Sequence, residues 1–143
     1  MKRLIILGAT CAFLAGCGSG GSDNTTTTTT TTPPLDVTGT WKGAVNSSVT
    51  GAATSTLVLA ETGTNVTGSY STTSSVTGDM VGTLNSTIFT FSLTPTMAHC
   101  TGALSGTGTI TTPTTGQPTM SFTYSGTTSC GGAESGTGSL TKQ

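Results

Sequence analysis

Few side chains in this sequence of 143 residues are suited to acid–base or nucleophilic chemistry. His99 is the only histidine, and no Gly-x-Ser-x-Gly motif marks a nucleophile. Spacing alone leaves a Ser-His-Asp triad open, because triad members converge in space and not in sequence. The carboxylates after residue 34 fall mostly in expected turns or at strand ends, where we expect solvated acids: Asp36, Glu61, Asp79 and Glu134. We therefore predict a protein that is not an enzyme and holds no cofactor and no metal.

Cys100 and Cys130 have positions that predict a disulfide bond. Their midpoint is position 115, and the turn expected between strands 101–110 and 118–125 is centred on position 114. An antiparallel hairpin pairs residues that are symmetric about its turn, so the two cysteines should meet near its open end. The alternatives are a redox couple, whose cysteines usually lie close in sequence, and a metal pair with His99, which would need further ligands.

The amino terminus has the layout of an export signal. A basic Met-Lys-Arg start is followed by an apolar run of about a dozen residues, shorter than the roughly 20 residues of a membrane-spanning helix. The run ends in Leu14-Ala15-Gly16-Cys17, which resembles the lipobox of bacterial lipoproteins. The alternative is an ordinary signal peptide in which the cysteine is incidental.

This resemblance implies where the mature protein resides. Cleavage after Gly16 would remove a signal peptide of residues 1–16, and a diacylglyceryl group on the Cys17 sulfur would hold the chain in a lipid bilayer. One acyl chain gives only marginal membrane binding, whereas two or three hold stably. Directly after the lipidated cysteine, Asp would signal retention in the inner membrane. This sequence has Gly18 at that position, which implies export to the outer membrane, on its periplasmic or its cell-surface face.

Residues 17–34 are predicted to form the lipidated amino terminus and a disordered tether. They contain a Gly/Ser stretch, a run of threonines and two prolines but no large apolar residue, so they cannot bury enough surface to offset the entropy of ordering. Residues 35–143 then form one domain. Only 6% of the residues are charged and the formal net charge is −1, which leaves no positive surface for nucleic acid.

The domain is expected to be all-β. Thr and Ser occupy 55 of the 143 positions and Gly occupies 21, while no stretch shows the 3.6-residue period of an amphipathic helix. Turn signals at 61–64 and 84–85, among others, divide the domain into eight predicted strands: 37–45, 54–60, 65–71, 76–83, 86–93, 101–110, 118–125 and 134–142. Short strands with tight connections favour a small antiparallel up-and-down β-barrel, with a β-sandwich as the alternative. A Thr-rich solenoid is rejected, because the Thr-x-Thr triplets have no constant period.

Alternation along the strands assigns the interior face. In the first strand every second residue from Val37 to Val45 is apolar or glycine, and the later strands repeat this pattern. An eight-stranded barrel is just wide enough to be filled by its own side chains or to hold one small ligand, and both remain open. If the interior binds a ligand, the ligand should be small and apolar, and the aromatic residues that could contact it are Trp41, Tyr70, Phe89, Phe91, Phe122 and Tyr124.

Gly39-Thr40-Trp41 in the first strand, followed by seven more expected strands, resembles the calycin superfamily of lipocalins and avidin-like proteins. The resemblance implies that the indole of Trp41 closes one end of the barrel. Two features depart from the family pattern. The last strand offers Lys142 where lipocalins pack an arginine across the tryptophan, and a single tryptophan does not match the several that line an avidin-like pocket. Biotin binding is therefore not expected, and no ligand residue carries over.

The sequence thus predicts a membrane-anchored lipoprotein whose small lipocalin-like barrel has a non-catalytic binding or structural role in the cell envelope. Its partners would be the lipid bilayer, through acylated Cys17, and a small apolar ligand or an envelope protein. The alternative is a protein-interaction module, such as a protease inhibitor or assembly factor, acting through a loop at Asn46-Ser47-Ser48. That loop carries no aromatic or arginine anchor. An enzyme acting through His99 is the third hypothesis.

Overall fold

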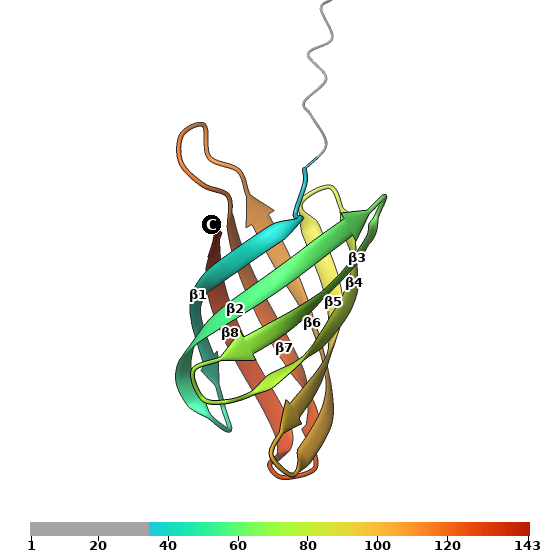
Figure 1. The fold of residues 1–143 in the computed structure, drawn as a ribbon, viewed down its shortest axis with the longest axis vertical. Coiled ribbons are helices and arrows are strands. Elements are labelled where there is room, and N and C mark those ends of the chain that lie inside the picture. Colours follow the sequence, from blue (N-terminus) through green and yellow to red (C-terminus); the bar gives the residue numbers. More distant parts are fainter. Residues whose placement is uncertain (1–34) are drawn as a thin grey trace, which may run out of the picture. The chain divides into compact units, whose positions relative to one another are not determined.

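Eight strands follow one another in residues 35–143, the part of the chain that the computed structural model describes (Figure 1). They are β1 (Gly39–Ser47), β2 (Gly51–Thr62), β3 (Asn65–Thr72), β4 (Thr77–Asn85), β5 (Ile88–Met97), β6 (Cys100–Thr111), β7 (Thr119–Thr128) and β8 (Gly132–Lys142). Each strand pairs antiparallel with its neighbours in sequence, and β8 pairs with β1 to close the barrel.

The predicted all-β, up-and-down barrel is therefore confirmed, and the β-sandwich is excluded. The predicted signal peptide, the lipidation site Cys17 and the linker of residues 17–34 lie outside the described residues. Within residues 35–143, no helix is long and apolar enough to cross a membrane.

One of the two predicted hairpin turns is wrong. β4 continues through Asn85, and the turn that was predicted at 84–85 begins at Ser86 instead. Ser86 has φ 56°, in the left-handed region that usually favours glycine, so the sequence carries no glycine signal at the actual turn. The turn predicted at 61–64 is confirmed, with Gly63 at φ 62°.

β5 is longer than predicted because it passes through Pro95. The predicted strand ends at Leu93, two residues before Pro95, and proline has no backbone N–H to give to the ladder. In the structure the β5–β6 pairing is interrupted at Thr94 and Pro95 and resumes at Thr96. The proline side chain is fully buried. The strand thus loses a ladder bond at this position and gains an apolar side chain in the core.

Side chains alternate between the interior and the surface, as the period of two predicts. The apolar side chains that point inward are buried in one cluster: Val37, Trp41, Leu57, Leu59, Val66, Tyr70, Val76, Met80, Leu84, Phe89, Phe91, Leu93, Leu104, Ile110, Met120, Phe122, Tyr124 and Leu140. A barrel of eight strands is filled by such a set, so its core lies inside the sheet and not between two layers.

Inward-facing glycines lie directly across from the aromatic rings. Phe122, for example, has Gly108 beside it on β6 and Gly138 beside it on β8. A Cβ atom on Gly138 would overlap the Phe122 ring, just as one on Gly106 would overlap the ring of Phe91. A ring over a glycine occupies the volume that a second side chain would need and shields the exposed backbone. The glycines therefore let a few large rings fill a narrow barrel.

The outer face carries mostly threonine and serine. One row of exposed threonines runs across five adjacent strands as register partners, from β4 to β8: Thr83, Thr90, Thr107, Thr123 and Thr137. Threonine suits this position because it is β-branched and its hydroxyl still meets water. The large apolar side chains on the surface are scattered singly and need no partner: Val49, Val58, Val81 and Ile88.

The barrel has two unlike ends, which we name the terminal end, where β1 begins and β8 ends, and the disulfide end opposite. At the terminal end Val37 and Trp41 are fully buried. The indole Nε1–H of Trp41 donates to the Val37 carbonyl at 2.9 Å, and the Val37 N–H donates to the Glu61 carboxylate at 2.9 Å. The segment that leads into β1 is thereby held over a tightly packed end.

Candidate functional site

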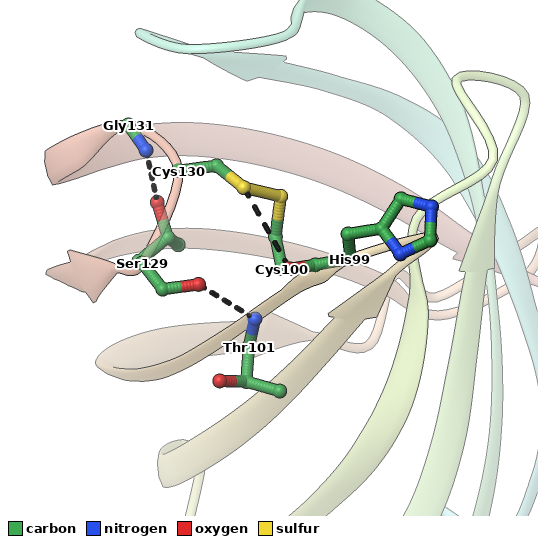
Figure 2. The surroundings of a disulfide bond; sticks show 7 residues. His99, Cys100, Thr101, Ser129, Cys130 and Gly131 are labelled. Carbon is green, nitrogen blue, oxygen red and sulfur yellow. Dashed lines mark hydrogen bonds between the residues drawn. A yellow bond between two sulfur atoms is a disulfide. The ribbon is translucent and has the colours of Figure 1, made fainter.

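Cys100 and Cys130 form a disulfide bond, which confirms the prediction (Figure 2). Their Cα atoms are 5.5 Å apart, and the bond joins the first residue of β6 to the loop between β7 and β8. In the β6–β7 ladder Ile110 pairs with Met120, so the hairpin is symmetric about position 115, the midpoint of the two cysteines. The predicted turn centre was one residue away.

Two hydrogen bonds join Thr101 and Ser129, the residues next to the two cysteines. The Ser129 N–H donates to the Thr101 carbonyl at 2.8 Å, and the Thr101 N–H donates to the Ser129 hydroxyl at 3.1 Å, the latter drawn in Figure 2. The Cys130 sulfur lies 4.0 Å from the His99 carbonyl oxygen. This is a contact and not a hydrogen bond, because a disulfide sulfur carries no hydrogen. A metal pair with His99 would need free thiolates, which the disulfide removes.

A cavity of about 50 Å³, the disulfide-end cavity, lies inside the barrel at this end. Its apolar wall includes Leu57, Met80 and Leu93, and Glu134 lies on its polar side. Exposed Ser74 is also part of the lining, so the cavity reaches the protein surface. A site of at least roughly 10–15 Å³ holds a water molecule, whereas drug-sized ligands need about 300 Å³ or more, so only a small group fits here.

Glu134 is a buried carboxylate in the wall of this cavity, with 8% of its surface exposed. The Ser47 hydroxyl donates to its Oε1 at 2.8 Å, and the Tyr124 hydroxyl donates to the same oxygen at 3.4 Å. Ser47 is itself oriented, because its Oγ accepts the backbone N–H groups of Val49 and Thr50 at 3.1 and 3.2 Å. The loop between β1 and β2 thus directs the one hydroxyl hydrogen of Ser47 toward the carboxylate.

The prediction that Glu134 is a solvated acid at a strand end is wrong. β8 begins at Gly132, two residues before the predicted start, so Glu134 lies within the ladder. It shares the inward face with Leu140, since both occupy even positions of the same strand. Counting back from Leu140 in steps of two is the sequence signal that would have found it. Ser47 differs from the prediction in the same way: the sequence predicts a loop at 46–48, but Ser47 is the last residue of β1 and points inward.

The hydroxyl of Tyr70 is buried and has no hydrogen-bond partner among the described residues. The side chain is 9% exposed and lines the disulfide-end cavity. Burial, followed by the negative charge of Glu134, raises the pKa of Tyr70 well above its usual range. Burial also raises the pKa of Tyr124. An unpaired buried hydroxyl costs about 1–3 kcal/mol, so Tyr70 marks a position where a partner atom would be stabilising.

The two tyrosines allow a test of this geometry at alkaline pH. Because the pKa of Tyr70 and that of Tyr124 are both raised, neither should ionise near pH 10 while the barrel is folded. In the unfolded chain both ionise near that pH. Their contribution to stability is therefore fully present below about pH 10 and is lost as the pH rises above it.

The measurement is absorbance at 295 nm followed against pH, in parallel with circular dichroism. Tyr70 and Tyr124 are the only tyrosines in the chain, so the rise in absorbance on phenol ionisation comes from these two residues, above the constant contribution and small unfolding shift of Trp41. We expect ionisation to coincide with unfolding. Reversible ionisation of both tyrosines near pH 10, with the circular dichroism unchanged, would contradict the burial described above.

The structure divides the six aromatic side chains named as ligand contacts into two groups. Three of them line the cavity: Tyr70, Phe122 and Tyr124. The other three do not line it and are packed in the core with 0–3% of their surface exposed: Trp41, Phe89 and Phe91. An edge-to-face contact between Phe91 and Phe122, with ring centroids 5.8 Å apart, joins the two groups.

The lining of the cavity is both polar and apolar. It combines one carboxylate, two phenols and serine hydroxyls with an apolar wall. Within the described part of the chain, no group of three or more His, Cys, Asp or Glu side chains could hold a metal ion. Comparison with protein-family models, with curated proteins and with solved structures finds no match for this chain.

Proposed function

We propose that this protein is an exported, lipid-anchored barrel that binds a small ligand in the disulfide-end cavity and performs no catalysis. The motif Leu14-Ala15-Gly16-Cys17 supports the lipid anchor. The Cys100–Cys130 bond supports export, because disulfides form and persist mainly in oxidising compartments. The binding role rests on one observation, a cavity with a buried carboxylate and an unpartnered hydroxyl in an otherwise filled barrel.

A purely structural role gives little reason for this arrangement. The Glu134 carboxylate takes an inward position that no basic side chain of residues 35–143 faces, and an apolar side chain there would bury more apolar surface in the barrel. The same holds for Tyr70, where phenylalanine would fill the space without a buried hydroxyl. Glu134 and Tyr70 are thus both less stabilising than apolar residues would be, and both face the same cavity. This is typical of a binding site, where residues are retained for recognition at a cost in stability.

The position of His99 favours binding over catalysis. This residue is exposed in the turn between β5 and β6, and it is not part of the cavity lining. The Ser47 hydroxyl donates to the Glu134 carboxylate, but no imidazole among residues 35–143 lies in the cavity to activate this hydroxyl. The polar groups are therefore placed to hold a ligand.

The lipid anchor can be tested by labelling with a radioactive fatty acid in a Gram-negative host. We expect the full chain to take up the label and to sediment with membranes. Cys17→Ala should abolish both. Cys11→Ala is the matched control, because it removes another cysteine that lies only six positions away, within the segment predicted to be cleaved, and it should keep both. Labelled Cys17→Ala protein would overturn the anchor.

A further inference from the structure

The disulfide-end cavity presents a negative charge that no basic side chain of the barrel meets. The basic residues of the described part of the chain are Lys42, His99 and Lys142, and none of them lines the cavity. The carboxylate of Glu134 has only the two hydroxyl donors described above. Buried charges in proteins are usually paired with an opposite charge, so the missing cation points to a ligand.

The acceptor atoms of the cavity are also only partly used. Both hydroxyl donors reach Oε1 of Glu134, and Oε2 receives no hydrogen bond from residues 35–143. The Tyr70 hydroxyl has no partner there. Ser55, which is 3% exposed, adds a third side-chain oxygen to the same lining. Besides the Ser47 and Tyr124 hydroxyls that Glu134 already uses, the cavity therefore offers the charged Oε2 and the hydroxyl oxygens of Tyr70 and Ser55.

We propose that this cavity binds the ammonium group of a small primary amine, with Glu134 as its counter-ion. An ammonium group has three N–H donors, which match the Glu134 Oε2 and the hydroxyl oxygens of Tyr70 and Ser55. An anion would be repelled, and a neutral ligand would leave the carboxylate charge unpaired. The aromatic walls add a favourable contact for a cation. The inference rests on the proposed binding function and names the chemical class of its ligand.

The size of the cavity restricts the amine to an unbranched one. An apolar cavity of about 150 Å³ accommodates benzene, so this one takes about two heavy atoms, the nitrogen and its first carbon. The rest of the ligand would leave the cavity on the side of Ser74, the exposed residue of the lining. A guanidinium or quaternary ammonium group has more heavy atoms than the site can enclose.

The probe is n-butylammonium chloride, and n-butanol, with the same shape and no charge, is the control ligand. The full chain in detergent micelles is titrated and followed by ¹H–¹⁵N chemical shifts. We expect saturable binding of n-butylammonium with a dissociation constant on the order of 1 mM. n-Butanol should bind at least about tenfold more weakly, because it lacks the charge-assisted hydrogen bonds. Potassium chloride at the same ionic strength should give no saturable change.

Three variants assign the binding to this cavity. Glu134→Gln keeps the shape of the side chain and should weaken n-butylammonium at least about tenfold. Tyr70→Phe should weaken it several-fold without unfolding the barrel, because the hydroxyl it removes has no partner in the protein. Asp79→Asn is the matched control. It removes one negative charge from the exposed outer face, and it should leave the affinity within about twofold of the wild type.

The outcomes separate this inference from the proposed function. Equal affinity of wild type and Glu134→Gln for n-butylammonium, or tighter binding of n-butanol than of n-butylammonium, would overturn the amine assignment and leave a binding cavity. Absence of saturable binding by either probe up to about 50 mM would overturn the amine site and the binding role together. Failure of fatty-acid labelling at Cys17 would affect only the anchor.

Discussion

Replacement of Gly43 by alanine should destabilise the barrel by about 3 kcal/mol or more. Gly43 faces the interior at the seam where β1 pairs with β8, opposite Leu140. A Cβ atom at this position would overlap the carbonyl oxygen of Ser139 and would lie 2.9 Å from the Cα of Leu140. Both are backbone atoms, so only separation of the two strands that close the barrel relieves the clash. Urea unfolding of residues 35–143, which contain every strand, measures the loss through Trp41 fluorescence.

Gly108→Ala is the matched control, because Gly108 also faces the interior and is also paired across a ladder. A Cβ atom there would lie 3.2 Å from the Cβ of Phe122 and 3.4 Å from the Ser121 carbonyl oxygen. Small shifts relieve such contacts, and alanine restricts the unfolded chain more than glycine does. The free energy of unfolding should therefore change by no more than about 1 kcal/mol. Equal decreases in the free energy of unfolding for Gly43→Ala and Gly108→Ala would contradict the conclusion that close packing between β1 and β8 makes Gly43 necessary.

Removal of the disulfide should lower the free energy of unfolding by roughly 3–4 kcal/mol. The two cysteines are separated by 30 positions, so the bond restricts a large part of the unfolded chain. Small domains have a net stability of about 5–15 kcal/mol, and the bond would account for a large share of it. Urea unfolding of the double variant Cys100→Ala, Cys130→Ala measures this effect directly.

Reduction provides the internal control for the double variant. Dithiothreitol should lower the stability of the wild-type domain by the same amount as the double substitution, and it should leave the variant unchanged. The two hydrogen bonds between Thr101 and Ser129 remain in both cases, so the native geometry near the loop is retained. A loss below about 1 kcal/mol in both experiments would indicate that the unfolded chain stays compact without the bond.

Most of the fold could be predicted because one local rule governs it. Alternation with a period of two places Val37, Trp41 and Phe89 in the interior, and all three are fully buried. The disulfide followed from symmetry about a single turn. That inference needs only the turn centre, so it tolerated errors in the strand ends.

The predicted strand ends and turns are wrong where the local structure depends on pairing with a neighbouring strand. Whether a strand survives Pro95 depends on the ladder around it, and whether Ser86 adopts a left-handed conformation depends on the register of its hairpin. Glu134 is the first residue of the predicted strand, but β8 begins at Gly132, and the extra pairing turns the Glu134 side chain to the interior. The cavity could not be predicted from the sequence at all, since its volume is what remains when the side chains of eight strands are packed together.

The outer face of threonine and serine determines how neighbouring copies meet on a membrane to which they are anchored as proposed. Two lysines and four carboxylates leave residues 35–143 with a side-chain charge of only −2. Electrostatic repulsion between such weakly charged domains is screened beyond a Debye length of about 8 Å at physiological ionic strength. Hydration of the hydroxyl groups, and not a charge barrier, then keeps the barrels apart. The density to which they can crowd would depend on barrel diameter and hardly at all on salt.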